Sequence, residues 1–354
     1  MSFFVGICPL AGRRFRLLAT TFTLMLLTGC QAVGFYQQAI LGQTNLLRNR
    51  ESTEVLLASV EADPALKHRI ELVNEILAFA DDHGLPSAGA YRSYVETGQQ
   101  FVIWNVFATM PFELSLKTSC FPIAGCVTYR GYFKKSDANR FARTMAGRGY
   151  DVYVGGVAAY STLGWFDDPL LDTFLFRPEE QLAALLFHEL SHQLVYVKND
   201  TRFNESVATT VEQYFLKNWL QQKGELNRFN RYLESQDRRK MVLVLINNTR
   251  LQLKELYSSD KPRDQMLTEK QQIFAQLVER YEQTIATWTD GQEFQGWMSG
   301  PLNNAKLETV ADYNQWVPGL SQLLKGHGFV EFKLALKRLG ALSLEDRETA
   351  LGNL

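Results

Sequence analysis

The sequence is poor in cysteine, in histidine and in any surplus of charge. Four cysteines and five histidines occur among 354 residues, and 37 basic residues nearly balance 38 acidic ones, for a formal net charge of -1. Without a surplus of basic residues the chain lacks the broad positive surface that binds nucleic acid, so we expect no nucleic-acid partner. Internal repeats and low-complexity linkers are also missing, and the length suffices for one large core or two smaller lobes.

Long apolar runs are scarce too, and the one near the amino terminus is too short to span a bilayer comfortably. Arginines within residues 13–16 precede an apolar stretch at residues 17–27, and small residues then lead into Cys30. This order is typical of a bacterial lipoprotein signal. We expect residues 1–29 to be removed and lipidation of Cys30 to anchor the protein to a membrane. Gln31 replaces the Asp that marks inner-membrane retention in similar lipoproteins, which favours the periplasmic face of the outer membrane.

Two cysteines remain for other roles, since Cys8 is lost with the signal and Cys30 carries lipid. Cys120 and Cys126 form an even pair in an oxidising compartment, and the five residues between them include Pro122. We expect a disulfide that closes this tight loop, with free thiols as the alternative. A metal site built on the pair would lack its third and fourth soft ligands.

The segment His188-Glu189-Leu190-Ser191-His192 is the strongest functional signal. It follows Pro178, acidic residues and strong helix formers, so it lies on a predicted helix. A step of four residues advances a helix by about 400°, which places both imidazoles on one face, where they can hold one Zn²⁺ per chain. Glu189 points about 100° away from His188 and can act as general base on a water in the open coordination position. The alternative is a core helix whose histidines only form hydrogen bonds.

A zinc peptidase site needs a third protein ligand, and two glutamates compete for that place. A turn near residues 198–200 precedes a second predicted helix, from about Asn204 to Leu220. Glu205, in its first turn, can face the imidazoles. Glu212 lies seven residues later, so it points the same way but about 10 Å farther along the axis. One ion cannot bind both.

Periodicity indicates a mostly helical α+β protein with a small mixed β-sheet before the HExxH helix. Apolar positions follow a helical spacing in the first part of the mature chain, alternate as in strands in the second, and are helical again after Pro178, apart from residues 290–301. We expect strands at 101–106 and 151–154 and a helix at 137–148. The predicted segments are the signal peptide at 1–29, a helical segment at 30–90, a β-rich segment with an edge strand at 91–170, and the helical metallopeptidase region at 171–354.

Several segments together resemble the bacterial putative aminopeptidases, a family of gluzincin-type zinc metallopeptidase lipoproteins. The matching segments are Cys120–Cys126 with Tyr129–Phe133, Tyr160–Pro169, the two metal segments, and Leu302–Ala305 followed by Tyr313. The resemblance implies a zincin-like fold and peptide hydrolysis from an amino terminus.

The resemblance also bears on the third ligand. Asn204-Glu205-Ser206-Val207-Ala208 resembles the Asn-Glu-x-x-Ala motif that supplies this ligand in gluzincins, which favours Glu205 over Glu212. Glu212 and Thr209 are then expected to orient an imidazole or a ligand carboxylate. Val207 departs from the family pattern, where we expect an aromatic residue and a slightly different packing behind the ligand helix.

Substrate contacts are predicted from the strand that ends near Tyr160. Zincin folds commonly place an edge strand just before the zinc helix, and a peptide can pair with such an edge, although a plain sheet is the alternative. Tyr160 is then a candidate pocket residue. Tyr313 and Tyr281 are candidate donors to the oxyanion, with Tyr313 preferred because it follows Asn303-Asn304. Arg130 is a weaker candidate for an anionic substrate group.

These patterns predict a zinc-dependent aminopeptidase that is anchored as a periplasmic lipoprotein and acts on peptides, with Glu189 as its base. One alternative is an endopeptidase with the same mechanism. Another is a binding or scaffold lipoprotein that keeps the fold. A purely structural zinc normally has four protein ligands, whereas only three are predicted to converge.

Overall fold

The computed structural model describes residues 34–87, 89–121, 125–159, 168–289, 291, 293–310 and 314–353. Three predicted functional residues, Cys30, Tyr160 and Tyr313, lie outside the described residues, and their roles stay predictions. The described chain is mostly helical with small sheets, which confirms that part of the predicted fold class. Among the described helices, none combines the length and apolar character needed to cross a membrane.

The helices are a first one at residues 34–48, α2 (Thr53–Ala58), α3 (Pro64–Asp82), α4 (Lys135–Ala146), α5 (Asp172–Leu175), α6 (Glu179–Ser191), α7 (Thr201–Gln222), α8 (Leu226–Tyr257), α9 (Arg263–Ile285), α10 (Gln295–Met298), α11 (Asn304–Leu307), α12 (Val317–Ala341) and α13 (Leu344–Gly352). The strands are β1 (Glu51–Ser52), β2 (Ser93–Val95), β3 (Ile103–Thr109), β4 (Ser119–Phe121), β5 (Gly125–Val127), β6 (Arg130–Tyr132), β7 (Asp151–Val157) and β8 (Leu170–Leu171). The short helix α10 lies in the stretch at 290–301 for which no helix was predicted, because four residues are too few to show a helical period.

The predicted sheet is divided among three small sheets in the described chain. The largest has the order β6-β3-β7, and β3 and β7 pair antiparallel from Ile103 opposite Val157 to Thr109 opposite Asp151. Both of these strands were predicted from alternation. Among the described strands β7 pairs with β3 alone, so it is an edge strand. The hairpin of β4 and β5 carries a disulfide between Cys120 and Cys126.

Strand β7 is held in place by side chains from the carboxyl-terminal half of the chain. Asn303 donates to the carbonyl of Val152 at 2.9 Å, and the backbone N–H of Asn304 donates to Asp151. Buried Lys270 from α9 pairs with the same Asp151 at 2.6 Å. The segment at 302–305, which contributes to the family resemblance, therefore positions this strand.

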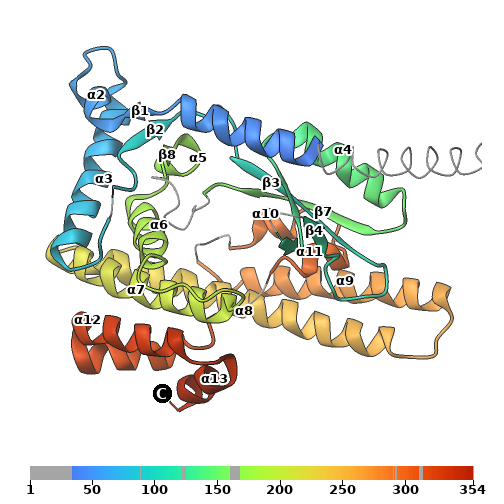
Figure 1. Ribbon diagram of the computed structural model, residues 1–354. Helices are drawn as coiled ribbons and strands as arrows, with labels where there is room; N and C mark the ends of the chain where they lie inside the picture. The colour runs from blue at the N-terminus through green and yellow to red at the C-terminus, as the bar shows by residue number, and fades with distance from the viewer. Residues whose placement is uncertain are drawn as a thin grey trace, which may run out of the picture.

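The main core forms around α6 and α7, with α3 and α12 packed against them (Figure 1). Both helices bury an apolar face completely, with Leu182, Leu186, Phe187 and Leu190 from α6 and Phe203, Val211 and Phe215 from α7. Val207, the predicted departure from the family, is 1% exposed in the same core. Because one face of each helix is buried, their remaining polar faces are free to build a site.

The loop between α6 and α7 contains the turn that was predicted near residues 198–200. Asn199 has a φ of 66°, and the side chain of Asp200 caps α7 by accepting a hydrogen bond from the N–H of Phe203 at 3.0 Å. Asp200 also pairs with buried Arg347 of α13 at 2.8 Å. This cap starts α7 at Thr201, three residues earlier than predicted, and so sets where Glu205 falls on the helix.

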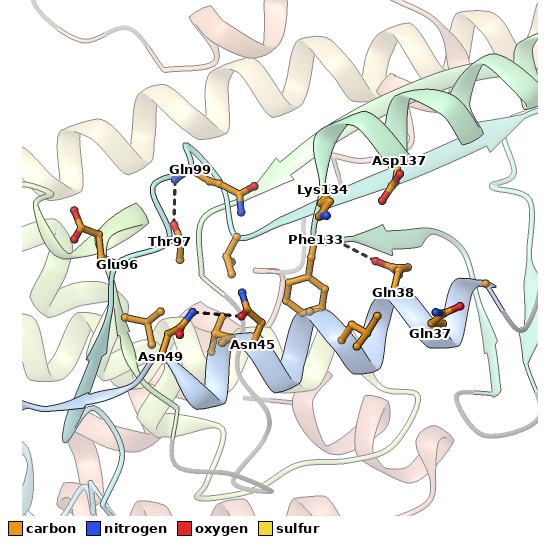
Figure 2. A pocket seen from close by; sticks show the side chains of 16 residues that line it. Gln37, Gln38, Asn45, Asn49, Glu96, Thr97, Gln99, Phe133, Lys134 and Asp137 are labelled. Atoms are coloured by element: carbon orange, nitrogen blue, oxygen red, sulfur yellow. Dashed lines mark hydrogen bonds between the residues drawn. The ribbon is translucent and has the colours of Figure 1, made fainter.

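The helix at residues 34–48 lies over the β6-β3-β7 sheet, with a cavity of about 620 Å³ beside it (Figure 2). Gln38 donates to the carbonyl of Gly131 at 3.0 Å and accepts from the N–H of Phe133 at 3.3 Å. Gly42 faces the ring of Phe133 so closely that a Cβ would clash with it. No histidine or cysteine lines this cavity, so the candidate chemistry lies elsewhere.

Candidate metal centre

Helices α6 and α7 bring together His188, His192 and Glu205, whose potential ligand atoms all lie within 4.8 Å of one another. His188 Nε2 is 3.2 Å from Glu205 Oε2, and His192 Nε2 is 3.8 Å from Glu205 Oε1. His188 is within α6, while His192 is its last, capping residue with helical φ and ψ of -62° and -16°. The four-residue spacing is therefore kept to the end of the helix, and both imidazoles face one carboxylate.

This donor set fits a divalent metal. The Nε2 atoms of both histidines point at opposite oxygens of a single carboxylate, and two imidazoles with one carboxylate are a ligand set that suits Zn²⁺ with one position left open. Glu205 lies in the second turn of α7, not the first, because the Asp200 cap starts the helix early. The shift does not remove it from the group, since its carboxylate still reaches both imidazoles.

Glu212 lies behind His188, on the side away from Glu205. Its Oε2 is 2.9 Å from His188 Nδ1, and Tyr232 of α8 donates a hydrogen bond to its Oε1. A carboxylate that holds the second ring nitrogen fixes which nitrogen can face a metal. Glu212 thus makes the contact that an orienting role needs, and the role itself stays a prediction. The hydroxyl of Thr209 donates to the Asn314 side chain at 3.1 Å, and the predicted role of Thr209 stays a prediction.

Glu189 is next to the metal group on α6, and its surroundings favour a proton acceptor near neutral pH. Burial raises the pKa of its carboxyl to about 7, helped by the negative charges of Glu205 and Asp168 and opposed by His188. Asp168 is 9% exposed, and its backbone carbonyl accepts from the N–H of Tyr91 at 2.8 Å. The sequence did not identify Asp168 as a site residue, although it belongs to the segment Tyr160–Pro169 that contributes to the family resemblance.

The pKa values of the two histidines are shifted in opposite directions. Burial would lower the pKa of His188, but hydrogen bonds to Glu205 and Glu212 outweigh it and raise the value to about 10. Burial and the nearby charge of His188 lower the pKa of His192 to about 4. Burial would raise the pKa of Glu205, yet its bond to His188 lowers it. The surrounding carboxylates therefore favour a positive charge at His188, and a metal cation bound there would be stabilised by the same carboxylates.

A cavity of about 740 Å³ lies between α6 and α8, and His188 of the metal group lines it, whereas His192 and Glu205 do not. Its α6 wall is one helical face with three- and four-residue steps, made of Glu180, Gln181, Ala184, Leu185, His188 and Glu189, and Arg177 lines the cavity just before this helix. Residues of α8 from Arg231 to Arg239 form the opposite wall, and Glu212 and Glu293 complete the lining. The cavity thus reaches His188 and Glu189 from solvent.

Two other predicted contacts are engaged elsewhere in the structure. Tyr281 is 3% exposed in a second core cluster, and its hydroxyl donates to the carbonyl of Glu293 at 3.0 Å. Arg130 lies on β6 with its guanidinium over the ring of Phe141 at 4.6 Å. Conversely, the sequence reading missed Tyr232 and Arg177 as residues of the site. Tyr232 lies 20 residues after Glu212 with no local signal, whereas the nearness of Arg177 to the HExxH helix was an available hint.

Comparison with known proteins supports the same assignment. No curated protein and no solved structure matches the chain. A family model described as "putative aminopeptidase" matches residues 34–351, which includes α6, α7 and every residue of the candidate metal group. The chain therefore belongs to the putative aminopeptidase family.

Proposed function

We propose that the protein is a zinc aminopeptidase that removes residues from the amino terminus of peptides. The observation that carries the proposal is the convergence of His188, His192 and Glu205 on one point, with Glu189 on the adjoining face and an open cavity beside it. Membership of the family supports peptide hydrolysis as the reaction. The zincin-like fold expected from the motif agrees with the helical pair α6 and α7 that carries the group.

The chemistry divides between the ion and the protein. A Zn²⁺ held by His188, His192 and Glu205 would act as the Lewis acid that polarises the scissile carbonyl and the attacking water. Glu189 accepts the proton of that water and passes it to the leaving amine, a task suited to a carboxyl whose pKa is about 7. Glu212 keeps the ring of His188 in place through its 2.9 Å hydrogen bond.

Two further parts of the proposal come from sequence. The edge strand β7 supports peptide binding by strand addition, with Tyr160 beyond its end as a pocket residue and Tyr313 as the donor to the oxyanion. A lipid on Cys30 would hold the enzyme on the periplasmic face of the outer membrane. Oxidising conditions there agree with the disulfide between Cys120 and Cys126.

Hydrolysis and metal content are tested together. The purified mature protein should hold about one zinc per chain and release amino-terminal residues from a library of short peptides. Glu189→Gln should keep the zinc and lose activity by about a hundredfold or more, because an amide cannot accept the proton. Glu234→Gln, an exposed glutamate on α8, is the matched control and should keep full activity. Equal activity of Glu189→Gln and the wild type would refute the mechanism.

The amino-terminal specificity needs its own comparison, a free peptide against its amino-acetylated twin. Acetylation removes the charge of the α-ammonium, so an aminopeptidase should cleave the acetylated peptide about tenfold more slowly or worse. Equal cleavage of both peptides, or cuts within longer chains, would identify an endopeptidase. A protein that binds zinc but cleaves no peptide would favour the scaffold alternative.

A further inference from the structure

The cavity beside the metal group extends well beyond the residues that carry the chemistry. Its α6 wall runs from His188 and Glu189 back to Arg177, which precedes the helix by two residues. Nine positions at 1.5 Å per residue separate Glu179, the first residue of α6, from His188 by about 14 Å along the axis, and Arg177 lies before Glu179. An extended peptide rises about 3.3 Å per residue, so a chain of four or five residues spans this length. The far end of the cavity can therefore contact a group several residues from the scissile bond.

The glutamates that line this cavity are largely paired with neighbouring residues, whereas two of its arginines are not. Four arginines and four glutamates line it: Arg177, Arg231, Arg238, Arg239, Glu180, Glu189, Glu212 and Glu293. Three of the glutamates already have partners. Glu180 pairs with Arg228 at 2.6 Å and Glu293 with Arg238 at 3.0 Å, while Glu212 is bonded to His188 and Tyr232. The acidic side chains are therefore largely neutralised by neighbours.

Two of the arginines have no such partner. Within the described chain, neither Arg177 nor Arg231 forms an ion pair or a side-chain hydrogen bond, although both line the cavity. Arg177 is half-buried, and burial lowers the pKa of its guanidinium with no carboxylate to offset it. Arg231 is exposed, so this desolvation concerns Arg177 alone, and a bound anion would offset it.

Both arginines line this cavity from elements that meet at the start of α6. Arg177 precedes α6, and Arg231 lies one turn after Arg228, whose guanidinium binds Glu179 and Glu180 at the start of α6. The metal group is at the opposite end of that helix. The two guanidinium groups therefore mark a site for an anion in the cavity that His188 and Glu189 also line, with Arg177 before the end of α6 that is opposite to the metal group.

We propose that Arg177 and Arg231 form a subsite that binds a carboxylate of the substrate peptide, several residues from the bond that is cleaved. The inference rests on the proposed function and adds a substrate class, namely short peptides that end in a free carboxylate or carry an acidic side chain. Guanidinium groups bind carboxylates through paired, charge-assisted hydrogen bonds, so this subsite distinguishes a carboxylate from an amide of the same shape.

The test measures binding without hydrolysis, by titration calorimetry on the zinc-loaded Glu189→Gln protein. Tri-, tetra- and penta-alanine with free carboxyl termini are compared with their carboxamides, and amidated peptides with one Glu are compared with the same peptides carrying Gln. In one of these two comparisons we expect the peptide with the carboxylate to bind at least about tenfold more tightly than its amide counterpart, because one charge-assisted contact would give such a difference. Preference in the first comparison identifies the carboxyl terminus as the ligand, and preference in the second identifies an acidic side chain.

Substitutions in the same background assign the preference to the two arginines. Arg177→Gln and Arg231→Gln should each reduce the ratio of amide to carboxylate dissociation constants towards one, whereas Arg177→Lys, which keeps the charge, should retain part of it. Arg280→Gln, an exposed arginine on α9, is the control and should leave the ratio unchanged. A ratio near one in the parent protein, or one that survives both Arg→Gln changes, would overturn the subsite. Wild-type cleavage of both acid and amide peptides would still support the peptidase.

Discussion

Glu212 Oε2 lies 2.9 Å from His188 Nδ1, so the carboxylate that competes with Glu205 for the metal instead holds the ring of a neighbouring histidine. The seven-residue step from Glu205 to Glu212 places both on one side of α7, and His188 lies between them, with Nε2 toward Glu205 and Nδ1 toward Glu212. One imidazole thus divides two otherwise similar glutamates into different roles.

Zinc affinity should separate these roles. Glu205→Gln removes a charged ligand and should nearly abolish zinc binding, while Glu212→Gln removes only an orienting hydrogen bond and should weaken binding by about 10- to 100-fold. Competition titration against a zinc chelator measures both dissociation constants. If Glu212→Gln emptied the site and Glu205→Gln did not, the two roles would have to be exchanged.

Tyr232 should act through Glu212. Tyr232→Phe removes the hydroxyl that donates to Glu212 but keeps the ring, which is 8% exposed, so the protein should remain folded. We expect zinc affinity to fall by less than it does in Glu212→Gln, and the double variant to be no worse than Glu212→Gln alone. The same chelator titration tests this, and additive losses would show that Tyr232 acts independently of Glu212.

Two lysine pairs in or beside α9 should contribute very differently to stability. Buried Lys270 pairs with Asp151 at 2.6 Å and donates to the Pro111 carbonyl, whereas Lys261 pairs with Glu269 at the same distance but is exposed. Lys270→Ala leaves a half-buried carboxylate at the end of β7 and should cost about 3 kcal/mol. Lys261→Ala should cost less than about 1 kcal/mol. Urea unfolding measures both, and equal losses would contradict the argument.

Alkaline pH should destabilise the fold through buried tyrosines. Burial, with the charge of Asp172, raises the pKa of Tyr94 from 10.0 to about 12. The unfolded chain therefore loses this proton first, so stability is fully present below pH 10 and falls as pH rises to about 12. Urea unfolding across this range should show the decrease, and Tyr94→Phe should make it shallower. Tyr129→Phe, at an exposed tyrosine, should leave the decrease unchanged. A free energy of unfolding in the wild type that does not change across this pH range would refute the prediction.

Cys30 should determine where the protein is found. Cys30→Ser removes the acceptor of the lipid, so the variant should leave the outer-membrane fraction as unlipidated or uncleaved protein. Membrane fractionation and intact-mass measurement test this together. An unchanged distribution of Cys30→Ser would show that the chain is held at the membrane by some other means.

Local spacing was enough to predict most elements around the site. The helix that carries His188, the strands β3 and β7 and the turn at Asn199 all follow from patterns within about ten residues, because hydrophobic periodicity and turn chemistry are local properties. The start of α7 was misplaced, since the Asp200 cap depends on a side-chain hydrogen bond that the apolar pattern does not record.

Sequence alone determined the spacing of His188, Glu189 and His192 and predicted the disulfide between Cys120 and Cys126. It also indicated membership of the aminopeptidase family, which the family model then confirmed. Only the tertiary structure grouped Glu205 with both imidazoles, joined Tyr232 to Glu212, and placed Arg177 and Arg231 in the lining of one cavity. The reason is physical. Spacing along a helix sets the direction of each side chain, but what that side chain meets depends on how α6, α7 and α8 pack together.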